Sequence, residues 1–431
     1  MSLTDKIKST ILSGAVPTNQ RKVGVEIEGL YYTSGFNRLP VNKTTQYSAS
    51  DLIKEISQST GQDSPFSYSL EPGGQLEWAS GPAKSLWDIQ KQFEHHKKLE
   101  DNICKKHSID RLYLSLEPFC LPSDIDLINV NKYQLMHNLF TQTGALGPWM
   151  MRNTTSMQLN IDFTSEQDAN EMAFLADAIQ PLYSILFSNS SFMRGKPVNT
   201  KNMRWKIWAD TDPERCGSLF EHGIASAEKI IDEYAAWISQ IKTIFKSSES
   251  GNTDYFNGTL GEMILSEPSK MQTHINSALH QSFTHVRFKT VLEIRASDRP
   301  PEGSEIAPAA FLAGLLTAPK TRTEGIDVIS RWSYEDRKKL IHTAHSLSLN
   351  QLGPENKSIG DWLEFLAELA LKGLNEREKI FRIKNEGPLV QYFLEDVLAR
   401  GPKTIQTQNM FQKTDASLHD FLRECCLDSA S

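Results

Sequence analysis

Residues 21–30 form the segment that most restricts how this chain can fold. Apolar side chains alternate along it with glycine and glutamate: Val23, Val25 and Ile27 against Gly24, Glu26 and Glu28. A period of two predicts a β-strand with one face in a core. Glu26 and Glu28 then share the other face, with Cα atoms roughly 6.5–7 Å apart. Carboxylates this close repel, so this face is either simply hydrated or completed by a bound cation.

Three more parts of the chain predict strands. Residues 66–70 and 75–79 flank a Pro-Gly-Gly turn and predict a hairpin, and residues 155–163 and 286–295 alternate like the first segment. Helical patterns occur at residues 4–13, 84–107, 133–140, 165–188, 226–245 and 309–316. From residue 333 onward the pattern is helical throughout. No Gly-x-Gly-x-x-Gly or Walker loop occurs, which disfavours a parallel nucleotide-binding sheet. The pattern predicts an α+β fold, with an antiparallel sheet backed by helices on its apolar face.

The polar faces of these strands carry mostly acids and amides. They comprise Glu26, Glu28, Glu71, Glu77, Gln158, Asn160, Asp162 and Glu293. If the strands join one sheet, these side chains line a common floor, and a floor of carboxylates needs cations. Hard oxygen donors without histidine or cysteine are typical of Mg²⁺ or Mn²⁺ sites rather than zinc sites. The sequence therefore predicts a Mg²⁺ or Mn²⁺ site, in which the metal also contacts phosphate groups.

Basic residues lie in or beside the same segments. They are Arg152, Arg204, Arg215, Arg287, Lys289 and Arg295. A guanidinium suits two-pronged contact with phosphate or carboxylate, although a single arginine is as often part of a surface ion pair. Residues 203–217 combine Trp208 with arginine and aspartate before a glycine, a mixture that is typical of functional loops. We therefore expect an anionic ligand near these cations.

Composition limits the partners of the chain. It has 431 residues, a formal net charge of −7 and a pI of about 5.9, which disfavours general nucleic-acid binding. Five scattered cysteines without metal-binding spacing indicate reduced thiols and a cytoplasmic protein. The most apolar stretch, residues 306–319, is too short to cross a bilayer. We expect small-molecule substrates and neither a nucleic-acid nor a membrane partner, and the sequence does not predict the oligomeric state.

Five motifs occur in a fixed order. They are Val-Gly-Val-Glu-Ile-Glu at residues 23–28, Leu-Glu-Pro-Gly-Gly-Gln-Leu-Glu at 70–77, Met-Met-Arg-Asn-Thr-Thr-Ser-Met-Gln-Leu-Asn-Ile-Asp-Phe at 150–163, Ile-Trp-Ala-Asp-Thr-Asp-Pro-Glu-Arg at 207–215 and Val-Arg-Phe-Lys-Thr-Val-Leu-Glu-Ile-Arg at 286–295. With these motifs the chain resembles glutamate–cysteine ligases of the plant and proteobacterial type. The resemblance implies a glutamine-synthetase-like bent antiparallel sheet that uses ATP and magnesium. We expect a catalytic domain at residues 1–330 and, where no motif matches, a helical C-terminal extension packed on it at residues 331–431.

The resemblance also implies roles for individual residues. The metal ligands would be Glu26, Glu28, Glu71, Glu77 and Glu293. The catalytic residues at the transferred phosphate would be Arg287, Arg295 and Glu293. ATP would be bound by Lys289, Arg287, Asn160 and Gln158, and the substrates by Arg152, Arg204, Trp208 and Arg215.

The implied reaction joins the γ-carboxylate of glutamate to the amine of cysteine through a γ-glutamyl phosphate made from ATP. This is the first step of glutathione biosynthesis. The chain departs from the family at residues 131–133, where it has Asn-Lys-Tyr instead of Gly-Arg-Tyr, and lacks a Pro-Met-Tyr signature after Gly217. Two alternatives remain: the same mechanism with another acceptor amine, or a non-catalytic sensor of nucleotides or cations. The complete acidic set and Arg295 speak against the sensor.

Overall fold

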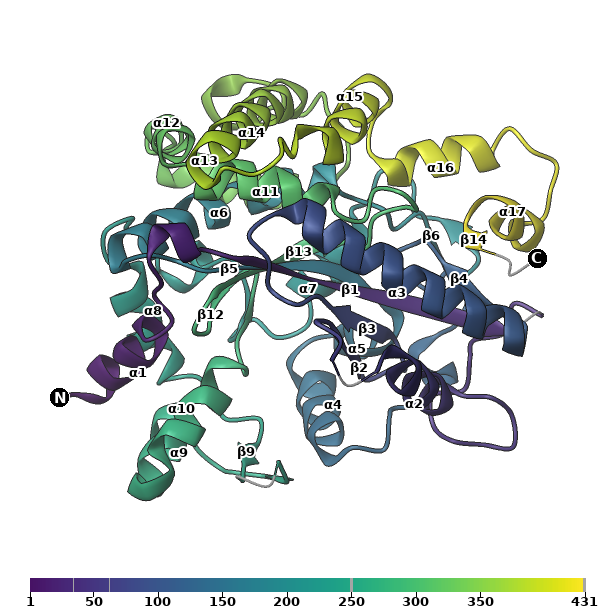
Figure 1. Cartoon of the computed structure of the whole chain (residues 1–431), viewed down its shortest axis with the longest axis horizontal. Coiled ribbons are helices and arrows are strands. Elements are labelled where there is room, and N and C mark those ends of the chain that lie inside the picture. Colours follow the sequence, from purple (N-terminus) through teal and green to yellow (C-terminus); the bar gives the residue numbers. More distant parts are fainter. Residues whose placement is uncertain (34, 62, 249–250, 429–431) are drawn as a thin grey trace.

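The computed structural model describes residues 1–33, 35–61, 63–248 and 251–428. Its centre is an eight-stranded sheet in the order β12-β13-β5-β1-β3-β2, with β4 paired to β1 and β14 paired to β4 (Figure 1). The strands are β1 (Val23–Thr33), β2 (Ser67–Leu70), β3 (Leu76–Ala79), β4 (Ile109–Leu112), β5 (Ser156–Ile161), β12 (Val286–Phe288), β13 (Leu292–Asp298) and β14 (Leu427–Asp428). All pairings between the described residues of this sheet are antiparallel.

β1 connects the parts of the sheet. Its first half pairs with β5 on one side and β3 on the other, whereas its second half pairs with β4. β13 adds a register shift between Ile294 and Ser297, an irregularity of the kind that bends a strand. The predicted α+β fold with a bent antiparallel sheet is therefore confirmed.

Two hairpins carry polar side chains across the sheet. The predicted hairpin forms as β2 and β3. The prediction of one continuous strand over residues 286–295 is wrong, because the Lys289 N–H donates to the Val291 carbonyl at 2.9 Å and closes a turn between β12 and β13. Strand-like alternation continues through this short turn, so the sequence pattern does not reveal it. The turn places Arg287 directly opposite Glu293.

The apolar face of the sheet packs against helices. Val25, Leu159 and Ile294 lie side by side across three strands and are at most 1% exposed. α6 (Glu166–Leu186) and α11 (Ala307–Thr317) join the same core, and every residue of α11 is buried because α14 (Ile359–Phe381) covers it from outside. In Figure 1 these helices lie above the sheet. The face of the sheet opposite the acids is therefore the face that packs against helices.

The remaining elements surround these layers. Helices before residue 250 are α1 (Leu3–Leu12), α2 (Ala49–Thr60), α3 (Leu86–His107), α4 (Asn131–Thr143), α5 (Gly147–Asn153), α7 (Met203–Ala209) and α8 (Ile230–Ile238). Later helices are α9 (Leu260–Ser266), α10 (Met271–Leu279), α12 (Pro319–Ile329), α13 (Tyr334–Thr343), α15 (Gln391–Arg400), α16 (Lys403–Phe411) and α17 (Leu418–Cys425). Short strands pair outside the main sheet, and they are β6 (Phe192–Met193), β7 (Lys196–Pro197), β8 (Cys216–Gly217), β9 (Lys246–Ser247), β10 (Thr253–Asp254) and β11 (Phe283–Thr284).

The helix expected over residues 226–245 is shorter than predicted. α8 ends at Ile238, and the backbone beyond it is bound by side chains from elsewhere. The Lys242 N–H donates to Glu214 at 2.9 Å, and the Ile244 N–H donates to the Gln281 side chain at 2.8 Å. Tertiary hydrogen bonds have therefore replaced the helical ones, although the apolar periodicity continues.

The hydrophobic core is continuous across residue 330. Leu340, Trp362 and Leu394 belong to the same buried cluster as the apolar face of the sheet. β14 pairs with β4, so the described end of the chain also joins the sheet. The predicted domain division at residue 330 is not tested by these contacts and stays a prediction.

The described helices include none that is both long and apolar enough to cross a membrane. Cys120, Cys216, Cys425 and Cys426 are free thiols. The expected cytoplasmic location stays a prediction.

The crossing of α11 and α14 provides a test of this packing. A Cβ atom at Gly373 would lie 1.9 Å from the Gly314 carbonyl oxygen, so Gly373→Ala must push the two helices apart. We expect it to lower the free energy of unfolding by about 2–3 kcal/mol or more, the scale of overpacking in a core. Urea denaturation measures this.

Gly360→Ala is the matched control on the same helix. Its Cβ would meet no atom closer than 3.6 Å, and alanine is the better helix former, so stability should stay equal or rise slightly. Equal stability of the two variants would contradict the close packing of α11 on α14.

Candidate active site

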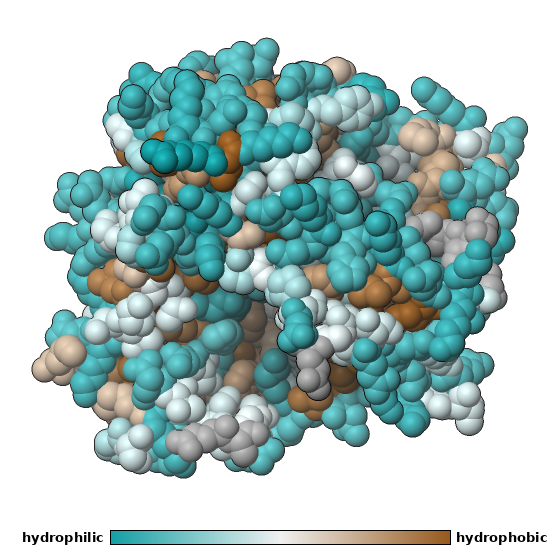
Figure 2. All heavy atoms as spheres, viewed as in Figure 1, coloured by the Kyte–Doolittle hydropathy of each residue, from teal (hydrophilic) through white to brown (hydrophobic). Residues whose placement is uncertain are grey.

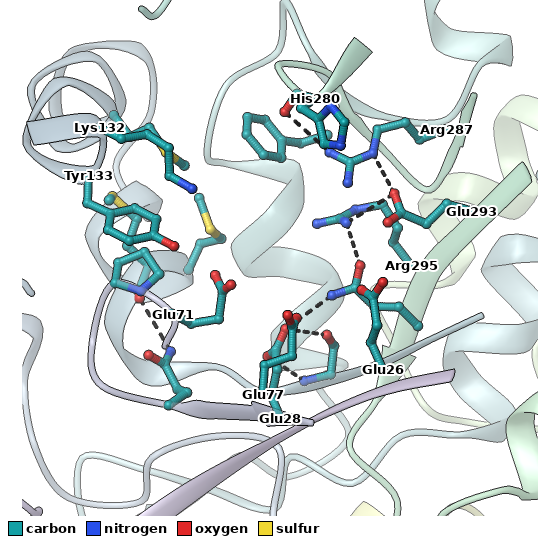
Figure 3. A pocket seen from close by; sticks show the side chains of 18 of the residues that line it. Glu26, Glu28, Glu71, Glu77, Lys132, Tyr133, His280, Arg287, Glu293 and Arg295 are labelled. Atoms are coloured by element: carbon teal, nitrogen blue, oxygen red, sulfur yellow. Dashed lines mark hydrogen bonds and ion pairs between the residues drawn. The ribbon is translucent and has the colours of Figure 1, made fainter. Parts of the chain in front are cut away.

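A cavity of about 530 Å³ lies on the polar face of the sheet. Its floor comes from β1, β3, β5 and β13, and its walls come from α4, α5, α7 and α10. Figure 2 shows the molecule hollowed between the regions of α10 and α4. Figure 3 shows acids at the bottom of this cavity and cations along one side.

Four glutamates form the floor: Glu26, Glu28, Glu71 and Glu77. Glu28 lies directly opposite Glu77 in the pairing of β1 with β3, and Glu26 lies opposite Gln158 of β5. Glu71 follows β2, in the Pro-Gly-Gly turn, and its N–H donates to the Gln75 carbonyl at 2.9 Å. Strand alternation and one turn thus bring together four of the five glutamates that the sequence analysis grouped (Figure 3).

Burial raises the pKa of three of these carboxyl groups. The pKa is raised to about 7 for Glu28 and Glu71 and to about 8 for Glu77, and each group is also raised by a neighbouring glutamate. Hydrogen bonds only partly offset this: Glu28 accepts from the Ser156 N–H and hydroxyl, both at 2.8 Å, and Glu77 accepts from Ser69 at 2.7 Å. The floor therefore favours binding of protons or cations.

Three cations surround Glu293 on the other side of the cavity. Arg287 Nε donates to its Oε2 atom, Lys289 Nζ lies 2.8 Å from its Oε1 atom, and Arg295 Nη1 lies 3.3 Å from Oε2. Burial alone would raise the pKa of Glu293, but these cations hold it well below its ordinary range. Both carboxylate oxygens of Glu293 are thus engaged by cations, and the expected direct binding of a metal by Glu293 stays a prediction.

Arg295 lies between the acidic floor and the cationic side. Its Nη1 atom donates to Gln158, and its Nε atom is buried without a hydrogen-bond partner. Burial would lower its pKa, but Glu293, Glu26 and the other glutamates raise it, so the guanidinium stays charged. Arg287 is held more firmly, because it also donates to the Ser282 carbonyl at 3.0 Å. Arg295 therefore keeps donor capacity for a ligand.

α7 supplies two further residues to this wall. Residues 203–217 were expected to form a loop, but they begin with this helix. Arg204 Nη2 donates to the Arg295 carbonyl at 3.2 Å, and the Trp208 ring lies 5.7 Å from the Arg204 guanidinium and 6.0 Å from that of Arg295. Both predicted substrate residues of α7 thus line the cavity next to Arg295.

Three predicted site residues lie elsewhere. Arg215 is fully buried, with Asp212 at 2.7 Å and the Lys242 carbonyl at 3.0 Å, so it joins loops rather than facing a ligand. Arg152 lines a separate groove. Asn160 donates to Glu26 at 2.9 Å and supports that carboxylate. We therefore do not assign Arg215 or Arg152 to the cavity, because flanking the right strand does not fix where a side chain points.

The cavity also contains residues that the sequence analysis missed. Lys132 and Tyr133 of α4 face Glu71 across it, and the Tyr133 hydroxyl donates to the Leu70 carbonyl at 3.2 Å (Figure 3). The departure from the family motif at residues 131–133 was the available signal. His280 lies beside Arg287, and burial together with that arginine lowers its pKa to about 4. No pattern in the sequence indicated that the end of α10 closes the cavity.

The turn that carries Glu71 fits closely against α5. A Cβ atom at Gly73 would lie 2.6 Å from the Arg152 Cα atom and 2.7 Å from its carbonyl oxygen. Gln75 donates from its side chain to the Thr154 carbonyl at 2.9 Å. Glycine is thus required at position 73, and the turn is fixed to the backbone of α5.

The acids of the floor do not form a complete metal cage. Within the described ranges, no three acidic, histidine or cysteine side chains are grouped so that they could hold a metal ion by themselves. Magnesium usually takes one or two carboxylates and completes its shell with water and phosphate oxygens. The donor set of hard oxygens therefore suits a metal that arrives together with a phosphate ligand.

Relatives of the chain are known from sequence. The model of glutamate-cysteine ligase family 2 matches residues 22–350. Glutamate–cysteine ligase A, chloroplastic, of Oryza sativa subsp. indica is 29% identical over 322 residues, which are 72% of this chain and 64% of the relative. The chloroplastic enzyme of Arabidopsis thaliana is 28% identical over 283 residues, 64% of this chain and 53% of the relative. The chain thus spans less than two thirds of these relatives.

Solved structures share the fold. The glutamate–cysteine ligase of Francisella tularensis, solved in complex with AMP, aligns over 94% of this chain and 88% of its own, with a TM-score of 0.58 and 13% identity. A bifunctional glutathione synthetase of Pasteurella multocida aligns over 96% of this chain and 51% of its own, with a TM-score of 0.50 and 12% identity. With the family model covering most of its length, this chain belongs to glutamate-cysteine ligase family 2.

Proposed function

We propose that the protein is an ATP-dependent ligase that joins the γ-carboxylate of glutamate to the amine of cysteine through γ-glutamyl phosphate. The observation that carries this proposal is the division of charge in the cavity. Four glutamates lie at its floor, and Arg295, Arg287 and Lys289 lie along one side. A metal–triphosphate carries the complementary pattern of positive and negative charge.

The comparisons support the same reaction. Family membership and the names of the plant relatives favour glutamate and cysteine as substrates. The AMP in the Francisella tularensis structure favours an adenine nucleotide. Activity, substrates and the metal remain proposals for this chain, because it covers only part of the plant relatives' length.

Magnesium or manganese fits the floor of the cavity. Glu28, Glu71 and Glu77 have raised pKa values because burial and neighbouring glutamates disfavour their negative charge, and all of their donor atoms are hard oxygens. We propose that one or two carboxylates from this set of three residues and Glu26 would bind the metal, with phosphate oxygens and water completing its shell. Bound there, a divalent cation neutralises the charge that develops on phosphate oxygens. Direct binding by Glu293 stays a prediction.

In the first step, a γ-carboxylate oxygen of glutamate attacks the γ-phosphorus of ATP, and ADP leaves. Arg295 and Arg287 face the transferred phosphoryl group, where their donors stabilise its negative charge. Glu293 holds these two guanidinium groups in position. Trp208 lies beside Arg295, with its ring centre 6.0 Å from the guanidinium.

In the second step, the amine of the acceptor attacks the acyl carbon, and the phosphate group that activated the carboxylate leaves. An apolar wall of the cavity suits a thiol side chain, because Met136, Met150, Met151 and Phe245 line it. Sulfur packs favourably against thioethers and aromatic rings. This apolar wall favours cysteine over a charged acceptor.

A phosphate-release assay with ATP, Mg²⁺, glutamate and a panel of amines tests the proposal. We expect the largest kcat/KM with cysteine. Turnover with a different amine would support the same mechanism with another acceptor. ATP binding without turnover on any amine would favour the nucleotide sensor.

Arg295→Lys tests the role of the guanidinium. Lysine keeps the positive charge, but its ammonium group cannot make the two parallel hydrogen bonds of a guanidinium. We therefore expect kcat to fall by roughly 10²-fold or more, the scale of removing one transition-state donor. The melting temperature should stay nearly unchanged. Arg331→Lys, at an exposed arginine, is the control and should behave as wild type. Near-normal kcat would leave Arg295 as a charge-balancing residue.

Glu28→Gln tests the acidic floor. We expect activity to be lost, because the amide cannot replace a carboxylate as a metal ligand. At about pH 8 without metal, the melting temperature should be equal or higher, since removing one charge relieves repulsion from Glu77. Glu364→Gln, at an exposed position of α14, is the control and should leave activity unchanged. A large loss of melting temperature in Glu28→Gln would show a structural role instead.

The raised pKa values predict how stability depends on pH. Each raised carboxyl contributes stability that is complete below its unfolded-state pKa, with a model value of 4.5, and is lost as pH rises through about 7 for Glu71 and about 8 for Glu77. We therefore expect the free energy of unfolding in EDTA to fall between about pH 5 and pH 8.5. Mg²⁺ should reverse the loss at the higher pH.

Urea denaturation at several pH values measures this dependence. Glu77→Gln should flatten the curve in EDTA, because it removes the group with the highest of these pKa values. Stability that is constant or rises over this range in the wild type would show that the floor is already compensated.

A further inference from the structure

A second opening lies on the other side of α4 from the cavity. This groove has a volume of about 820 Å³ and is formed by α4, Arg152 of α5 and the loop over residues 122–130. Asn42 holds that loop, since its side chain accepts from the Asn129 N–H at 2.9 Å and donates to the Leu127 carbonyl at 2.8 Å. The groove is therefore framed by fixed backbone.

Arg152 is the central feature of this groove. Its side chain is only 8% exposed, yet it forms no hydrogen bond or ion pair with any described residue, and its Nε atom is buried without a partner. A buried charge without a partner is costly, so guanidinium groups in such positions are normally paired. Arg215, which is fully buried, has an aspartate and two carbonyls as partners.

Further hydrogen-bonding groups line the same groove. His137, on the groove side of α4, has a buried Nδ1 atom without a hydrogen-bond partner, and burial together with Arg152 lowers its pKa. α4 also begins at Asn131, in the groove, without a side-chain cap, so N–H groups of its first turn are available to an anion.

Little negative charge offsets these donors. Asp126 is the only acid among the described residues that line the groove; it is exposed and forms no ion pair with Arg152, although its charge acts on that guanidinium and partly offsets the effect of burial on its pKa. The protein as a whole carries a net charge of −7, so this local excess of donors is not a general property of its surface. It indicates a site for a specific anion.

We propose that this groove, with Arg152 and His137 at its centre, binds a small molecule that carries a phosphate or carboxylate group. A guanidinium fork and an imidazole suit the oxygens of either group. The proposal does not depend on the reaction in the cavity. The two openings share their walls: Lys132 and Tyr133 of α4 face the cavity, whereas Asn131 and His137 face the groove.

The stability of Arg152→Met separates a binding role from a structural one. If Arg152 serves to bind a ligand, replacing its unpaired charge with an apolar side chain should leave the melting temperature equal or raise it when no anion is present. Arg38→Met is the matched control, since the Arg38 side chain is only 7% exposed but lies 3.5 Å from buried Glu117, so this variant should lose stability. An unfolded or clearly less stable Arg152→Met protein would overturn the proposal.

Binding itself is measured on the His137 ring by NMR, with histidine-labelled protein. The resonance is assigned by its absence in His137→Gln, and inorganic phosphate and succinate are the two probes. We expect a saturable shift with at least one of them, which identifies phosphate or carboxylate as the preferred group. Arg152→Met should weaken that binding by about tenfold or more, the contribution of a charge-assisted hydrogen bond.

Arg295→Met distinguishes the groove from the cavity. It removes a cation of the cavity, so anion binding seen at His137 should keep its dissociation constant in this variant. Binding lost in Arg295→Met but kept in Arg152→Met would place the anion in the cavity and overturn the proposal. Absence of a saturable shift with both probes would overturn it as well.

Discussion

The structure depends on apolar packing on one face of β1 that keeps like charges together on the other. Val25 and Ile27 are anchored in a core that extends through α6 and α11 to α14. Each buried side chain of this kind contributes roughly 1.5–3 kcal/mol. Because neighbours along a strand point to opposite faces, the same anchoring fixes Glu26 and Glu28 next to Glu77 despite their repulsion. The stability of the core thus sustains an arrangement of acids that is unfavourable by itself.

The two sides of the cavity manage charge in different ways. On the floor, acids outnumber their partners, and burial raises their pKa values. Around Glu293, three cations share one carboxylate, which leaves an excess of positive charge. Arg295 lies where the two sides meet and is held by Gln158 between them. This separation of charge persists because the surrounding sheet keeps the acids of the floor and the cations around Glu293 apart. The cavity is therefore preorganised for a ligand that carries both positive and negative charge.

Local rules were sufficient for the sheet and its acidic floor. A period of two placed Glu26, Glu28 and Glu77 on one face, and Pro-Gly-Gly chemistry placed Glu71 at its edge. Features that depend on distant contacts were not predictable in this way. The turn at Lys289 is hidden within continuous alternation, and α8 ends early because Gln281, far along the chain, binds the backbone beyond it. Arg152 and Arg215 flank the expected segments, but side-chain direction in a loop or short helix has no period to reveal it.

The close approach of Gly73 to Arg152 has a consequence for both openings. The backbone of α5 and the turn that carries Glu71 are in van der Waals contact, with no side chain between them to absorb a displacement. Tightly packed backbone segments move together rather than independently. Occupancy on one side that shifts α5 therefore changes the position of an acid on the other side. By thermodynamic reciprocity, such a shift changes the affinities of the cavity and the groove by the same factor. The close contact at Gly73 is the physical link through which the two openings would be coupled.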